Sequence, residues 1–275
     1  MEIKYFCPHW GSKHIDFNLF LTDVKNAGYD GVEMSLPPDQ NEKASILEAI
    51  SNHDLLFIAQ HWETSDIDFE KHKTEYRSRL VNLATANPMF INSQTGKDFF
   101  TFEQNAALIQ IAAEVSEQYK VRIIHETHRG KFSFAAHITA DYLTRLPGLR
   151  LGFDISHWCN VAESYFHDQQ PAVDLAISRA DHIHARVGFS EGPQVPDPRV
   201  PEWKEAVDIH IGWWKRIVEN NRKAGLPIFT ITTEFGPFPY MTSMPFTQQP
   251  ISNQWDINVY MMKMLKSLFS DKQVN

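Results

Sequence analysis

Carboxylate and imidazole side chains that could bind a metal ion stand at the ends of several predicted strands. Three carboxylates follow the β-forming runs Ile-Ile-His, Leu-Gly-Phe and Ile-Thr-Thr, and a histidine closes His-Ile-His; these residues are Glu126, Asp154, Glu234 and His184. A buried carboxylate without a partner is unfavourable, so each needs a cation or hydrogen-bond donors nearby. This mostly hard ligand set predicts one divalent metal ion, with Mn²⁺, Co²⁺ or Mg²⁺ favoured and Zn²⁺ a weaker candidate.

Other polar and aromatic groups near predicted strand ends are candidates for binding a substrate. Histidine and arginine could grip hydroxyl or carboxylate groups, and flat indole rings could cover the apolar face of a sugar. A structural role is the alternative for each of them. The candidates are His61, His128, His157, Arg186, Trp10 and Trp62. The Pro-, Met- and aromatic-rich residues 235–251 could cover the same place or meet a neighbouring subunit of a homo-oligomer.

Short β-branched or aromatic runs alternate with amphipathic helical stretches along the chain, which is typical of parallel βα units. We predict strands near residues 3–7, 31–35, 55–61, 89–93, 121–126, 149–154, 181–186 and 228–234. No glycine-rich phosphate-binding turn follows the first strand, which favours a closed (β/α)8 TIM barrel over an open doubly wound sheet. The ends of barrel strands meet at one mouth, where active sites form, so the polar strand ends are expected to gather there.

Local signals also define the helices between these strands. Gly28 follows a helical stripe where a terminating glycine is expected, and Thr101 begins another helix at capping-box spacing from Gln104. A last helix is predicted from about Asn253, and the helix near residues 171–178 looks short.

Composition limits the class of protein. The chain has 275 residues, 43% hydrophobic and 22% charged, which suits a single barrel domain over residues 1–275. A net charge of -8 argues against nucleic acid as the main partner, and no apolar run is long enough to span a membrane. Two cysteines and no signal-like N-terminus predict a cytoplasmic protein.

At these residues the chain resembles the xylose isomerase-like barrel superfamily, in particular its sugar phosphate isomerases and epimerases. The resemblance extends over essentially the whole chain. It consists of Ala-Gly-Tyr-Asp-Gly-Val-Glu at 27–33, Glu126, Asp-Ile-Ser-His at 154–157, His-Ile-His at 182–184, and Glu234. Each piece alone is weak, but their order on successive strands is fairly specific.

The resemblance implies a metal held by Glu126, Asp154, His184 and Glu234, with the two glutamates as acid and base and His157 beside the substrate. We therefore predict an isomerase or epimerase of a sugar or keto-sugar that abstracts a proton next to a carbonyl and passes through an enediolate. The same apparatus would serve a lyase or dehydratase of the inosose or 3-keto-glycoside type. A catalytically idle sugar-binding barrel is a further alternative.

Two departures bear on the substrate. The ketose 3-epimerases of the superfamily resemble this chain less after the seventh strand, because Arg186 comes only two residues beyond His184 and a proline-rich stretch, residues 188–201, follows. The apurinic endonucleases of the superfamily use three zinc ions and extra histidines. Here the fourth predicted strand is followed by Gln94, and the nearest match to their Asp-x-His pair is Asp-Pro-Arg at 197–199, so a nuclease is disfavoured.

Overall fold

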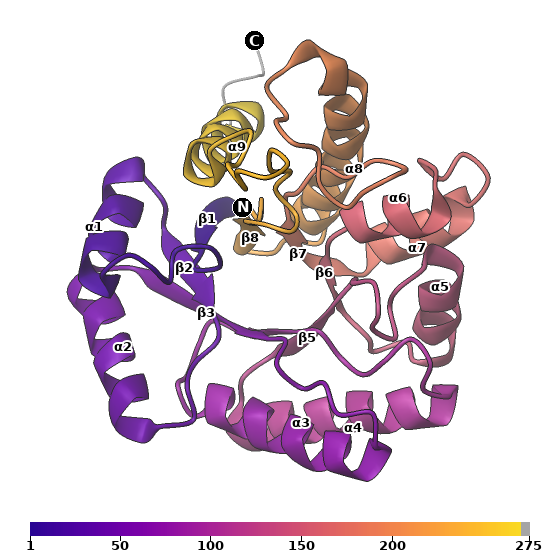
Figure 1. Cartoon of the computed structure of the whole chain (residues 1–275). Coiled ribbons are helices and arrows are strands. Elements are labelled where there is room, and N and C mark those ends of the chain that lie inside the picture. Colours follow the sequence, from indigo (N-terminus) through magenta and orange to yellow (C-terminus); the bar gives the residue numbers. More distant parts are fainter. Residues whose placement is uncertain (271–275) are drawn as a thin grey trace.

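Residues 1–270 are described by the structure, a computed structural model (Figure 1). Their strands are β1 Glu2–Pro8, β2 Gly31–Met34, β3 Leu56–His61, β4 Ile91–Ser93, β5 Ile123–Glu126, β6 Leu151–Phe153, β7 Ala180–His184 and β8 Ile228–Thr232. Each strand pairs in parallel with the next, and β8 pairs with β1 to close the barrel. The predicted (β/α)8 barrel is therefore confirmed and the open sheet is excluded.

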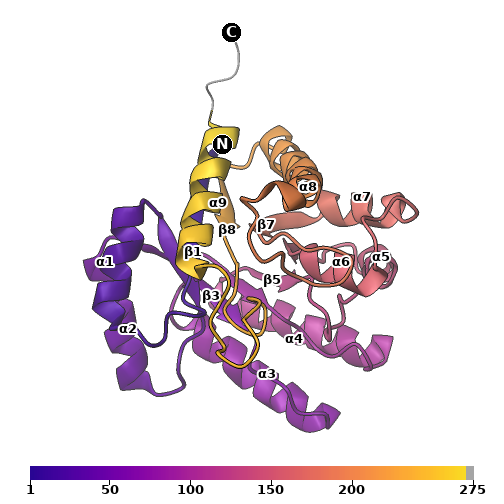
Figure 2. The ribbon, with the colours of Figure 1, turned by 45° about the horizontal axis from the view of Figure 1, so that its top comes forward.

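Helices surround the barrel as an outer ring (Figure 1). They are α1 Phe17–Ala27, α2 Gln40–Asn52, α3 Phe69–Ala84, α4 Phe102–Tyr119, α5 Ala136–Arg145, α6 Ser156–Ala162, α7 Gln170–Ser178, α8 Lys204–Lys223 and α9 Gln254–Phe269, with a 3-10 turn Pro201–Trp203 before α8. The last helix, α9, lies against β1, so the two ends of the described chain are neighbours (Figure 2). Between β6 and β7 the chain forms two helices, where one short helix was predicted.

The helix signals of the sequence are confirmed. Gly28 ends α1 in the left-handed region at φ 94°, which a residue with a Cβ adopts only with strain. Thr101 and Gln104 form the capping box of α4, and the Asn253 side chain accepts the amide of Asp256 at the start of α9.

The seventh strand is shorter than predicted, and this changes the position of one candidate residue. The prediction carried this strand through Arg186, but β7 ends at His184. The amide of Arg186 donates to the carbonyl of His184 at 3.0 Å, which turns the chain out of the sheet. Thus His182 and His184 share the inner face of the barrel, whereas Arg186 belongs to the loop above it. Asp154 and Glu234 likewise lie just beyond β6 and β8.

The barrel interior changes character along its axis. Farther from the mouth, the interior is filled by a small apolar cluster of Phe6, Ile58, Phe90 and Ile124. Side chains point inward at every second residue of a strand, so Gln60 and Glu126 stand one step closer to the mouth than Ile58 and Ile124. The packed apolar cluster thus supports the polar groups above it. Within residues 1–270, no helix is long and apolar enough to cross a membrane.

Candidate active site

The four predicted metal ligands come together at the mouth of the barrel. One ligand atom from each of Glu126, Asp154, His184 and Glu234 lies within 4.8 Å of the others. They come from the ends of β5 to β8, and none is more than 4% exposed. We call these four residues the outer cluster.

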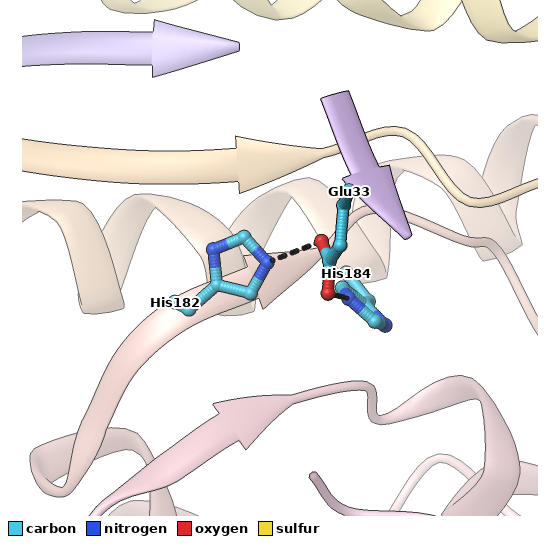
Figure 3. Close-up of side chains that lie close together, drawn as sticks. All are labelled: Glu33, His182 and His184. Atoms are coloured by element: carbon cyan, nitrogen blue, oxygen red, sulfur yellow. Dashed lines mark hydrogen bonds and ion pairs between the residues drawn. The ribbon is translucent and has the colours of Figure 1, made fainter. Parts of the chain in front are cut away.

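His184 is turned so that its two ring nitrogens face different partners. Its Nδ1 lies 2.8 Å from Glu234 Oε2 and 3.6 Å from Glu126 Oε1. Its Nε2 lies 2.9 Å from Glu33 Oε1, on the opposite side of the ring (Figure 3). An Nε2–H that donates to Glu33 leaves the Nδ1 lone pair facing the glutamates, which is the arrangement of a metal-binding imidazole.

Glu33 anchors a second, deeper set of buried residues. Its Oε2 lies 3.2 Å from His182 Nε2 and accepts the Thr232 hydroxyl, and its Oε1 accepts Asn92 Nδ2 at 3.1 Å. Burial raises the pKa of Glu33, but His184 and His182 outweigh it and hold the pKa well below its usual range. We call Glu33, His182 and His184 the inner cluster; all three are labelled in Figure 3. The sequence placed Glu33 at a strand end but gave it no role.

Two atoms of the outer cluster face each other without forming a hydrogen bond. His184 Nδ1 and Glu234 Oε2 are both buried and lie 2.8 Å apart, yet neither makes a hydrogen bond of good geometry within the described chain. Buried polar atoms are nearly always satisfied, so such atoms indicate a missing partner. A divalent cation between them would satisfy both, and the donor set of three carboxylates and one imidazole fits such an ion.

Negative charge is in excess at the outer cluster. Burial raises the pKa of Glu126 to about 7, and Glu234 and Asp154 add to the rise while His184 opposes it. Burial also raises the pKa of Asp154, although Arg186 lowers it. For Glu234, burial is outweighed by His184 and Arg186, which lower its pKa. A cluster that favours protonating its own carboxylates is one that favours a cation.

Arg186 lies against the outer cluster. Its guanidinium pairs with Asp154, lies 3.4 Å from Glu234 Oε2, and is 2.7 Å from His157 Nε2. It is 1% exposed, and the ring of Tyr240 stacks 4.7 Å from it. The prediction that Arg186 contacts substrate stays a prediction, but the side chain lies beside the residues that would bind it.

The other predicted substrate residues fall into two groups. The rings of His128 and His157 lie 3.8 Å apart beside Arg186, and Trp10 and Trp62 line the cavity described below. The fifth residue, His61, is fully buried, with its ring nitrogens 3.1 Å from Ser93 Oγ and 2.8 Å from Thr64 Oγ1. His61 does not line the cavity, and its geometry is that of a core histidine.

Two glutamines position the glutamates. Gln60 Nε2 donates to Glu234 Oε1 at 3.0 Å, and Gln94 Nε2 lies 3.3 Å from Glu126 Oε2. Sequence reasoning noted Gln94 as a polar strand end but missed Gln60. Its signal was the alternation in β3, which puts Gln60 on the same inner face as Ile58.

A cavity of about 910 Å³ opens beside the outer cluster. Its lining includes Gln60, Gln94, His128, Arg186 and Glu234 at the polar end. Tyr240 also lines it, so segment 235–251 contributes one residue to the cavity; whether the segment covers the mouth or meets a neighbouring subunit stays a prediction. Trp10 is packed so closely on Gly236 that a Cβ there would lie 2.1 Å from its ring.

His61 and Asp197 occupy positions that the nuclease arrangement would need for metal binding. No cluster of potential ligands within residues 1–270 includes His61. Asp197 is held by the guanidinium of Arg199, with 2.6 Å between Oδ2 and Nη2. Asp197 likewise belongs to no group of potential metal ligands among the described residues.

Comparison with known proteins shows the fold. No family model matches the sequence, and no curated protein matches it either. Among solved structures, 3-keto-D-glucoside 4-epimerase from E. coli matches with a TM-score of 0.63 at 12% identity, over 97% of this chain and 100% of that one. A probable 3-DHS dehydratase involved in petrobactin synthesis from Bacillus anthracis gives 0.59 at 14%, over 96% and 98%. Endonuclease IV from Thermus thermophilus gives 0.55 at 12%, over 97% and 98%.

These likenesses cover nearly all of the chain, and the structure search also matches xylose isomerase-like barrel proteins. The chain therefore has the xylose isomerase-like (β/α)8 fold, as the sequence resemblance implied. At identities this low the likeness concerns the fold, and function has to be argued from the site.

Proposed function

We propose that the protein is a divalent-metal-dependent isomerase or epimerase of a sugar or keto-sugar, which moves a proton at a carbon next to a carbonyl. The observation that carries this proposal is the geometry of the outer cluster. Glu126 and Glu234 come from different strands, yet both reach toward His184 Nδ1, at 3.6 Å and 2.8 Å, beside an open cavity.

The metal would be held by Glu126, Asp154, His184 and Glu234. When bound, a divalent ion supplies positive charge that stabilises the oxyanion developing as a proton leaves the neighbouring carbon. Mn²⁺, Co²⁺ or Mg²⁺ is favoured by the mostly oxygen ligand set.

The chain's own residues would move the proton and orient the sugar. Glu126 and Glu234 would remove and return the proton, as acid and base on the two sides of the reacting carbon. Gln60 holds Glu234 through one oxygen and so directs the other toward the cluster. Arg186, with His157 and His128, would bind substrate oxygens next to the reacting carbons.

The solved structures support a sugar-processing enzyme at the level of fold. One is named as an epimerase of a keto-glucoside and another as a probable dehydratase. Proton abstraction next to a carbonyl is the shared first step of epimerisation, isomerisation and elimination of a β leaving group. Product mass separates them, because only elimination changes it.

The proposal is tested by proton exchange with solvent. A panel of ketoses and 3-keto-glycosides would be incubated in D₂O with the Mn²⁺- or Co²⁺-loaded protein, and loss of the carbon-bound proton followed by NMR. We expect Glu126→Gln and Glu234→Gln each to lower the exchange rate by about 10²–10⁴-fold.

The matched control is Glu114→Gln, which removes an exposed carboxylate that pairs with Arg77 on the outer helices. It should exchange at the wild-type rate. Full exchange in both cluster variants would remove the acid and base roles. Tight metal binding without exchange in any sugar of the panel would instead favour the idle sugar-binding barrel.

A further inference from the structure

The cavity beside the outer cluster has two ends of opposite chemical character. The polar end is formed by residues of β3 to β8 and the loops above them. The other end comes from the first two βα units, whose helices α1 and α2 stand together on one side of the barrel (Figure 1). We call this end the apolar arm after six of its side chains, Ile15, Phe17, Met34, Leu36, Pro37 and Ile46; the same two units also contribute His9, Lys13, Ser35 and Glu42 to the lining.

The size of the cavity exceeds what a single sugar ring requires. At about 910 Å³ it lies near the upper end of the ~300–1,000 Å³ range of pockets that hold drug-sized ligands. The polar end already provides the outer cluster and its hydrogen-bond partners for a sugar. The apolar arm is therefore additional space.

The chemistry of the arm limits what can occupy that space. None of the six side chains of the arm carries a hydrogen-bonding group, and Met34 and Leu36 are only 7% and 2% exposed. A hydroxyl placed against them would lose water without gaining a partner, which is unfavourable. Lys13 and Glu42 are exposed, and the Ser35 hydroxyl donates to Glu63, so an apolar group suits the buried part of the arm better than a second sugar ring does.

Two indole rings also line the cavity. Trp62 lines the cavity and is 48% exposed, with the Lys13 ammonium 5.8 Å from its ring. Trp10 lines the cavity as well, at 5.9 Å from the Arg186 guanidinium. A large exposed indole at a cavity rim favours a flat or apolar ligand that covers it.

We propose that the substrate is a sugar bearing an apolar substituent, an aryl or alkyl aglycone, that lies in the apolar arm while the sugar ring lies at the outer cluster. This inference rests on the proposed function for the position of the sugar ring. The apolar arm itself follows from the residues that line the cavity and does not depend on the proposed reaction.

The test compares matched glycosides by isothermal titration calorimetry on the full chain loaded with Mn²⁺. The probes are phenyl and methyl β-D-glucoside, the corresponding galactosides, and phenol alone. Because the phenyl ring would be buried in the arm, we expect the phenyl member of a pair to bind at least about tenfold more tightly.

Variants then locate the effect. Trp62→Ala removes an indole from the rim, and Ile46→Asn places an amide in the arm. Both should reduce the phenyl preference several-fold, and Ile46→Asn should leave methyl glycoside binding unchanged. The control Phe99→Ala removes an aromatic side chain that is 63% exposed and does not line the cavity, and it should keep the full preference.

Equal affinity of the phenyl and methyl members of each pair, including no binding by either, would overturn the proposal that the substrate carries an apolar aglycone. Phenol binding as tightly as the phenyl glycosides would also overturn it, because no sugar would then be anchored. Failure of the proposed function is a different result, namely no proton exchange in D₂O. Repeating the titrations on Glu234→Gln, which should lack exchange, shows whether the phenyl preference stands without the proton chemistry.

Discussion

Two buried clusters of acidic and imidazole side chains share His184, and they differ in how well their atoms are satisfied. In the inner cluster both oxygens of Glu33 accept hydrogen bonds, and its two histidines flank it. In the outer cluster His184 Nδ1 and Glu234 Oε2 lie 2.8 Å apart but make no hydrogen bond of good geometry, although both are buried.

This difference indicates different roles for two clusters built of the same residue types: the inner cluster supports His184, and the outer cluster suits a bound cation. One carboxylate between two imidazoles is balanced by charge and by hydrogen bonds, so an ion would have to break existing bonds to enter. Three carboxylates beside one imidazole and one guanidinium are not balanced. The comparison therefore supports placing the proposed cation at the outer cluster, with the inner cluster orienting His184.

The largest effect is expected from removing an outer ligand. Asp154→Ala, together with the more conservative Asp154→Asn, should weaken Mn²⁺ affinity by at least about 100-fold. Elemental mass spectrometry of protein prepared without chelator should find about one ion per wild-type chain and almost none per variant. His182→Gln, which alters only the inner cluster, should keep its metal. If the wild-type protein held no metal, even after soaking with Mn²⁺ or Co²⁺, the alternative of a catalytically idle sugar-binding barrel would be favoured.

A smaller loss is expected from changing the residue that orients His184. Glu33→Gln replaces the acceptor of the His184 Nε2 proton, so the ring loses its fixed tautomer while every outer ligand stays in place. We expect Mn²⁺ affinity, measured by calorimetry, to fall about 10–100-fold. Glu114→Gln is the exposed control. If Glu33→Gln kept its Mn²⁺ affinity, with the fold intact by circular dichroism, the inner cluster would have no role in orienting His184 for metal binding.

The smallest effect concerns pH and the metal-free protein. The folded pKa of Glu126, about 7, lies above its usual value of 4.5, so its protonated form stabilises the fold. That contribution is fully present below pH 4.5 and is lost as pH rises through about 7. With chelator present, Glu126→Gln should therefore gain stability relative to wild type between pH 5 and pH 8, on the order of 1 kcal/mol. Urea unfolding at both pH values measures this; a constant difference between the two proteins would contradict it.

Much of the fold could be predicted from the sequence because its signals are local. Short β-branched or aromatic runs predicted the strands, and residues such as Gly28, Thr101 and Asn253 predicted helix ends. Strand ends were less certain, as β7 shows. The chain turns out of the sheet after His184, where the Arg186 amide donates to the His184 carbonyl, a contact that the sequence pattern does not reveal.

The sequence by itself determined the barrel and the four residues of the outer cluster, since parallel strands of known order bring their ends to one mouth. Only the tertiary structure decided what surrounds them. Glu33 and Gln60 gained their roles from strands brought together across the barrel, and His61 was assigned to the core by Ser93 and Thr64. The apolar arm likewise exists only because two loops distant from the ligands in sequence fold against the same cavity. Contacts of this kind depend on packing between elements, which no local pattern of residues encodes.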